Sequence, residues 1–175
     1  MRRGNLAIAG AALAVAVAGG VLVLGRGSTG ATATYSSSRV SVSVRVIGAG
    51  DRRTLEAVFT PDTPDLHLYG PDLPTEGIDG AGRPTRVNVT GGGWRAVSSS
   101  PETESVVPTP FPTVLPGFSA PFSILPPGAV TLRVPIEATS GNRGTVEVAV
   151  TYMACSIEGR CFAPVEAQPM TVSVP

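Results

Sequence analysis

The sequence predicts an all-β protein, an antiparallel β-sandwich preceded by one N-terminal hydrophobic helix. Glycine and proline number 21 and 17 among 175 residues and place turns at short intervals, while 42% of the residues are hydrophobic and suffice for a core. Beyond the N-terminal segment, no stretch carries apolar residues at i, i+3, i+4 and i+7 over three turns. Short runs of alternating polarity replace that helical pattern, and they favour strands.

The clearest strand is expected at residues 40–46, where valine alternates with serine and arginine. A strict period of two fits only a strand with one buried face. The segment 54–60 repeats the pattern with Leu55, Ala57 and Phe59. Six more runs have strand character and are separated by Gly/Pro turns: Leu66–Tyr69, Thr85–Val89, Trp94–Val97, Val130–Ala138, Thr145–Met153 and Met170–Val174. Eight short strands of this kind are typical of a sandwich.

Residues 1–33 are predicted to be a signal peptide or a single-pass membrane anchor with a short tether. Arg2 and Arg3 precede an uncharged run, Leu6–Gly25, that at 1.5 Å per residue spans the roughly 30 Å apolar core of a bilayer. The basic end keeps the N-terminus cytoplasmic, so the rest of the chain is translocated. Residues 31–33 (Ala-Thr-Ala) offer a cleavage site. Retention and cleavage both remain open, and either predicts an extracytoplasmic protein, membrane-anchored or secreted.

The exported part is predicted to be one domain, residues 38–175, behind a small, polar tether at 27–38. All 13 cationic residues are arginine, and the first 26 residues hold three of them. The remainder has 10 cationic against 13 acidic residues, a net charge of about −3. Nucleic acid is therefore excluded as an expected partner, because its binding needs a basic surface.

Residues 98–127 carry eight prolines and three phenylalanines, Phe111, Phe118 and Phe122. This composition is too irregular for a regular hairpin and predicts a long loop or a covering flap. The alternative is an irregular crossover between sheets whose phenylalanines fill the core. The sequence leaves both open.

Cys155 and Cys161 are the only cysteines, and they follow the predicted strand Thr145–Met153 directly. In an exported protein such a pair is expected to be oxidised. Closing a loop of about seven residues stabilises a fold by roughly 2 kcal/mol, so a structural role stays open. No metal and no cofactor are expected, since two thiolates and the lone His67 fall short of the four ligands of a zinc site.

The cysteine segment resembles a known family. Residues 150–155 (V-T-Y-M-A-C) and 161–165 (C-F-A-P-V) are similar to the segment V-x-Y-Q-A-C-x5-C-x-P-P of the N-terminal domain of the thiol:disulfide interchange protein DsbD. Upstream, 66–69 (L-H-L-Y), 77–79 (G-I-D) and 83–87 (R-P-T-R-V) resemble the aromatic strand and the glycine-rich turn of that family. The resemblance covers roughly residues 40–174.

The resemblance implies an immunoglobulin-like sandwich in which Cys155 and Cys161 shuttle between dithiol and disulfide, with Cys161 as the attacking residue. Electrons would come from a membrane thiol reductase and pass to thioredoxin-like exported proteins. Full-length family members continue into a multi-helix membrane domain and a thioredoxin domain, which have no counterpart in these 175 residues. The electron donor is therefore expected to be a separate protein.

The resemblance also nominates residues near the cysteines. Tyr69 matches the tyrosine of the aromatic strand, whereas His67 stands where an aromatic residue is usual. A flap with an aromatic tip shields the pair in the family, and Phe111 or Phe118 could serve here, although the flap motif itself is not matched. From a different class, the alternative is a non-enzymatic binding or structural module in which the disulfide is only a staple.

Overall fold

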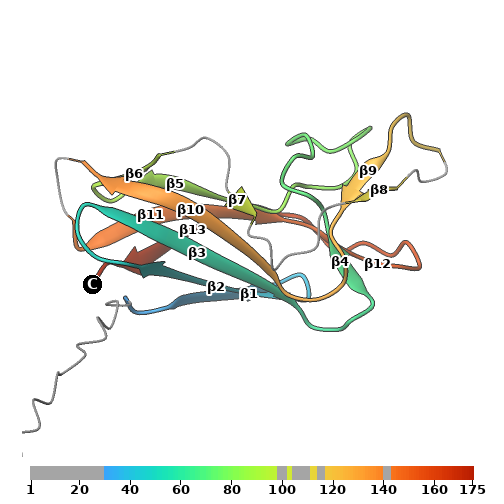
Figure 1. The fold of residues 1–175 in the computed structure, drawn as a ribbon. Helices are drawn as coiled ribbons and strands as arrows, with labels where there is room; N and C mark the ends of the chain where they lie inside the picture. Colours follow the sequence, from blue (N-terminus) through green and yellow to red (C-terminus); the bar gives the residue numbers. More distant parts are fainter. Residues whose placement is uncertain (1–29, 98–101, 104–110, 114–116, 140–142) are drawn as a thin grey trace, which may run out of the picture.

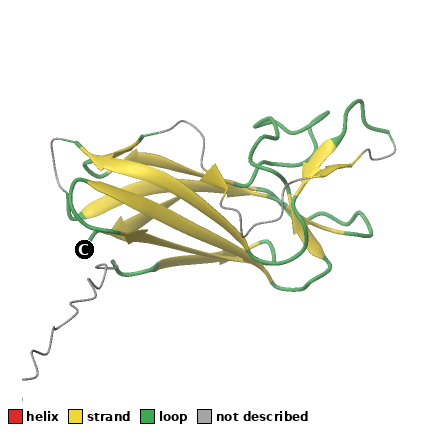
Figure 2. Cartoon of the chain, in the orientation of Figure 1, coloured by secondary structure: helices red, strands yellow, loops and turns green. Residues whose placement is uncertain are grey.

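The computed structural model describes residues 30–97, 102–103, 111–113, 117–139 and 143–175. All regular secondary structure in this part is strand (Figure 2), which confirms the all-β class. The expected N-terminal helix lies outside the described residues. Within them, no helix is long and apolar enough to cross a membrane.

The larger sheet has the strand order β1-β2-β3-β10-β6, with β7 also paired to β10, and all its pairings are antiparallel. In β2 the predicted alternation is realised, because every second residue from Val40 to Val46 is buried. The strands of this sheet are β1 Ala33–Ser37, β2 Val40–Ile47, β3 Arg52–Pro61, β6 Trp94–Ala96, β7 Glu102–Thr103 and β10 Val130–Ala138.

A second antiparallel sheet, visible in Figure 1, has the order β13-β11-β5. It shares one apolar core with the first sheet. Its strands are β5 Arg86–Gly91, β11 Thr145–Tyr152 and β13 Val165–Ser173. All eight predicted runs are strands, and β13 begins earlier than expected. Phe59 of β3 meets Tyr152 of β11 edge-on in this core, with ring centroids 5.7 Å apart.

The tether interpretation of residues 27–38 is wrong for its second half, because Ala33–Ser37 form β1. The small residues there pair with β2, and Ala33 and Tyr35 pack against the core. The hydroxyl of Tyr152 donates a hydrogen bond of 3.0 Å to the carbonyl oxygen of Ser37, which ties β11 to β1. Burial raises the pKa of Tyr152 to about 12, so the hydroxyl keeps its proton.

Four short strands gather at one end of the two sheets, opposite the C-terminus in Figure 1. They form two antiparallel pairs, one of β4 with β12 and one of β8 with β9. The second pair corrects the expectation that residues 98–127 hold no hairpin: a ladder of three residue pairs tolerates the prolines around it. Their bounds are β4 Leu66–Leu68, β8 Phe111–Thr113, β9 Phe122–Ile124 and β12 Ala154–Ser156.

A buried carboxylate links three neighbouring strands of the larger sheet on the face opposite the core. Glu56 of β3 lies in register between Arg45 of β2 and Arg133 of β10. Nε and Nη2 of Arg45 are 2.8 and 2.5 Å from Oε1 of Glu56, and Nε and Nη2 of Arg133 are 3.0 and 2.7 Å from Oε2. Only 5% of the Glu56 side chain is exposed. The two arginines therefore satisfy a charge that would otherwise be buried alone.

Candidate functional site

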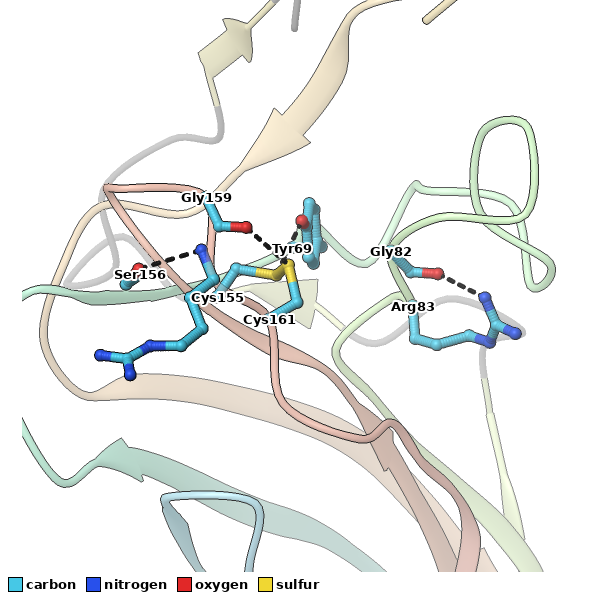
Figure 3. Close-up of a disulfide and its surroundings, with 8 residues drawn as sticks. Tyr69, Gly82, Arg83, Cys155, Ser156, Gly159 and Cys161 are labelled. Atoms are coloured by element: carbon cyan, nitrogen blue, oxygen red, sulfur yellow. Dashed lines mark hydrogen bonds between the residues drawn. A yellow bond between two sulfur atoms is a disulfide. The ribbon is translucent and has the colours of Figure 1, made fainter. Parts of the chain in front are cut away.

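Cys155 and Cys161 form a disulfide at the end of the molecule where the four short strands lie (Figure 3). Cys155 lies in β12, and a turn from Ser156 to Gly159 brings the chain back beside it. Gly159 has φ +86°, a conformation that side chains disfavour, so glycine suits this return. The backbone of Cys161 then bridges that of Cys155 in antiparallel fashion, with the two Cα atoms 4.0 Å apart.

The two cysteines differ sharply in exposure. Cys155 is 1% exposed and belongs to a small apolar cluster, whereas Cys161 is exposed to solvent. The difference follows from the local sheet: β12 is covered by β4 on one side and by residues 160–162 on the other, while Cys161 lies on the outer edge. Cys161 is therefore the more accessible of the two cysteines to an incoming thiolate.

Tyr69 places its hydroxyl against the buried sulfur. It follows β4 directly, and its backbone bridges Ile124 of β9 and Pro84, which fixes the direction of the ring. The hydroxyl oxygen is 3.1 Å from Sγ of Cys155, and it is the donor because a disulfide sulfur carries no proton (Figure 3). Burial raises the pKa of Tyr69, so this donor stays protonated at neutral pH.

A cavity of about 170 Å³ lies beside the disulfide. Both cysteines line it, together with Tyr69 and a largely apolar set of side chains that includes Phe118, Phe122 and Met153. The rings form a chain: Phe118 meets Phe122 edge-on at 5.0 Å between centroids, and Phe122 meets Tyr69 at 5.5 Å. The result is an apolar wall next to the exposed sulfur.

The segment that carries Phe118 is tied to a neighbouring loop by one carboxylate. Oδ2 of Asp79 accepts hydrogen bonds from the backbone N–H and the hydroxyl of Ser119, at 2.9 and 2.8 Å. These bonds lower the pKa of Asp79. Arg83 holds the same loop by donating to the carbonyl oxygens of Glu76, Gly80 and Gly82, the last at 2.7 Å (Figure 3). The loop and the phenylalanine segment are thus joined over the cavity.

Among the residues that the structure describes, no arginine lines the disulfide cavity. Burial lowers the pKa of His67, so its imidazole is neutral at pH 7. Arg160, next to Cys161 in sequence, instead lines a separate cavity of about 370 Å³ with Arg39 and Phe162. A thiolate formed from Cys155 would accordingly depend on the Tyr69 hydroxyl for a partner.

The structure places the predicted residues as follows. Tyr69 contacts Cys155, and Phe118 lines the cavity with both cysteines. The backbone of Phe111 lies in β8 opposite Ile124, while its side chain lies outside the described part. Phe122, which the sequence did not nominate near the cysteines, is the ring that packs on Tyr69.

Sequence reasoning missed two other contributors. Met153 lies two residues before Cys155, a spacing that in extended chain puts both on one side, and this signal could have found it. The hydrogen bonds from Ser119 to Asp79 join residues 40 positions apart, and no pattern in the sequence predicts them.

Among the described residues, no group of three His, Cys, Asp or Glu side chains is placed to hold a metal ion. Comparison of the whole chain with family models and with curated proteins gives no match. The case for function therefore rests on the chemistry of the disulfide and its surroundings.

Proposed function

We propose that this chain is an extracytoplasmic thiol–disulfide exchange module with an immunoglobulin-like sandwich, related to the N-terminal domain of DsbD. The observation that carries the proposal is the asymmetry of the disulfide. Cys161, which is exposed, is bonded to Cys155, which is buried. The Tyr69 hydroxyl donates a hydrogen bond to Sγ of Cys155. A purely structural staple needs neither the exposure nor the donor.

In the reducing direction, a thiolate of the electron donor attacks Sγ of Cys161. The Cys155–Cys161 bond breaks, a mixed disulfide forms on Cys161, and Cys155 leaves as a thiolate. A second donor thiolate attacks the donor's own sulfur in that mixed disulfide and releases Cys161 as a thiolate. Two electrons have then entered the module, and the donor has become a disulfide.

The module passes these electrons on by the reverse steps. The thiolate of Cys161 attacks an exported protein's disulfide and forms a mixed disulfide, and one sulfur of that protein leaves as a thiolate. Cys155 then attacks Cys161, restores the internal disulfide and releases the second sulfur, so the exported protein has gained two electrons. Thioredoxin-like exported proteins are the proposed acceptors, and a separate membrane thiol reductase is the proposed donor.

Phe118 is proposed to shield Cys155, the buried cysteine of the pair, while Cys161 stays exposed. It lines the cavity that both cysteines line, and the Asp79–Ser119 bonds hold its segment there. The flap of the related family is thereby assigned to residues 117–122 of this chain. An exposed Cys161 with an apolar neighbour suits a protein partner that covers both at once.

The test is the reduction potential of the Cys155–Cys161 pair in the exported domain, measured by equilibration with glutathione or dithiothreitol, alkylation of free thiols and mass spectrometry. The reduction potential of an exchange module is expected to lie between about −180 and −270 mV, and the protein should keep its fold when reduced. A value well below about −300 mV, or loss of the fold on reduction, would instead identify a staple in a binding or structural module.

Tyr69→Phe is expected to slow reduction of the disulfide by dithiothreitol roughly tenfold. The variant removes the donor to the departing Cys155 thiolate, and a hydrogen bond to a charged group contributes about 1.5 kcal/mol. The matched control is Tyr152→Phe, which also removes a buried hydroxyl but one bonded to Ser37 away from the disulfide. The control should lower stability by about 1 kcal/mol and leave the rate unchanged. Equal rates for Tyr69→Phe and the parent would remove Tyr69 from the mechanism.

A further inference from the structure

The exposed cysteine lies on the outer edge of a small local sheet. Two backbone hydrogen bonds join residues 160–162 to β12: the N–H of Ser156 donates to the carbonyl oxygen of Arg160, and the N–H of Phe162 donates to that of Ala154, at 2.8 and 2.9 Å. These bonds flank the facing cysteines, which therefore form a non-hydrogen-bonded pair. The short Cα–Cα distance of 4.0 Å agrees with such a pair.

This register decides where the backbone groups of each cysteine point. In an antiparallel ladder, a residue whose pair is not hydrogen-bonded on one side directs its N–H and C=O to the other side. For Cys155 the other side is β4, where it lies opposite His67. Two residues along each strand, the N–H of Ile157 donates a hydrogen bond of 3.0 Å to the carbonyl oxygen of Asp65. Because hydrogen-bonded pairs recur every second residue, this bond identifies Cys155 and His67 as a hydrogen-bonded pair too.

For Cys161 the other side is solvent. Its N–H and C=O point away from β12, and among the described residues neither has a hydrogen-bond partner. The free edge is short, because the carbonyl oxygen of Ala163, which faces the same way two residues on, already accepts a hydrogen bond of 2.7 Å from the Ser38 hydroxyl. One donor and one acceptor are thus left unpaired on the residue whose sulfur is exposed.

We propose that this edge is a docking site for an extended polypeptide segment of the redox partner, next to the partner's cysteine. A residue of that segment exchanges both backbone hydrogen bonds with Cys161 and adds one bridge to the local sheet. The inference rests on the proposed function and specifies its substrate class: cysteines in accessible, extended protein segments, in preference to small thiols that have no backbone to offer.

The geometry of a disulfide supports this occupant. Residues that exchange both backbone bonds across antiparallel strands have Cα atoms about 5.5 Å apart, which is also the common Cα–Cα distance across a disulfide. A partner cysteine held on this edge therefore brings its own sulfur to Cys161 without further movement. The apolar cavity lined by Phe118 and Met153 lies beside the same sulfur and can receive a flanking side chain.

The experiment uses the Cys155→Ser variant, in which a mixed disulfide on Cys161 has no internal thiol to resolve it. The labelled protein is coupled to a cysteine-containing peptide, to the same peptide with the three amides around its cysteine N-methylated, and to 2-mercaptoethanol. Hydrogen exchange of the Cys161 amide is then followed by NMR. The unmodified peptide should slow this exchange at least fivefold, whereas the N-methylated peptide and 2-mercaptoethanol should leave it at the rate of the uncoupled variant.

The inference is overturned if all three adducts form and the Cys161 amide exchanges equally fast in each. That result would leave the proposed function standing, since Cys161 would still have accepted partners. Failure of any adduct to form would instead count against the proposed function itself. Equal protection by the unmodified and N-methylated peptides would mean burial without the bridge, and would also overturn the inference.

Discussion

Cys161→Ser is expected to abolish thiol–disulfide exchange. Cys155→Ser should still carry out the first step, in which Cys161 attacks the partner's disulfide and forms a mixed disulfide. Cys161 is exposed and Cys155 is 1% exposed, so only the first can meet a partner's disulfide. After reduction, each variant is mixed with an oxidised thioredoxin-like protein, and covalent adducts are counted by mass spectrometry. Cys155→Ser should accumulate the mixed disulfide, and Cys161→Ser should form at least a hundredfold less.

The two variants control for each other, because each loses the same disulfide and the same roughly 2 kcal/mol of loop restraint. A difference between them then does not come from loss of the disulfide, and chemical denaturation of each variant measures the separate cost of the hydroxyl that Cys155→Ser buries. Comparable adduct formation by both variants would contradict the assignment of Cys161 as the attacking residue. Faster reaction of Cys161→Ser would transfer that role to Cys155 and would require the segment around Phe118 to move away.

Glu56→Ala is expected to lower the free energy of unfolding by about 3 kcal/mol. Removing one partner of a buried ion pair costs 3 to 5 kcal/mol, and the lower figure applies because Arg45 and Arg133 are partly exposed and can turn to water. Chemical denaturation with an unchanged m-value measures the loss. Glu76→Ala, on an exposed loop of the same domain, is the control and should change stability by less than about 0.5 kcal/mol.

The same carboxylate predicts how stability depends on pH. Burial alone would raise the pKa of Glu56, but the hydrogen bonds from Arg133 and Arg45 outweigh it and bring the pKa below its ordinary value of 4.5. A lowered folded-state pKa contributes stability that is present above pH 4.5 and is lost as pH falls through the folded value. The parent should therefore lose stability below pH 4.5 more steeply than Glu56→Gln. Parallel curves would show that Glu56 does not supply this dependence.

Much of the site followed from local sequence. Cys155 and Cys161 are the only cysteines of a chain expected to be exported, which predicted that they would be oxidised to a disulfide, and the structure has that bond. Tyr69 was nominated from the short motif around it. Phe118 was nominated as one of two candidates, and the sequence could not rank it against Phe111 or recognise Phe122. Phe118 and Phe122 are distinguished by contacts with residues far away in the chain, since both line the cavity beside Cys155 and Cys161 and Phe122 packs on Tyr69.

The sequence was enough to predict the all-β class and the positions of eight strands, because period-two burial is a local property of each segment. It also determined that the two cysteines belong together. In contrast, residues 33–37 form a strand because they pair with β2, a long-range contact that their small polar side chains do not reveal locally. The burial of Cys155 and the exposure of Cys161 depend on long-range contacts as well. β4 pairs with the strand that carries Cys155, whereas no described strand covers the outer edge beside Cys161.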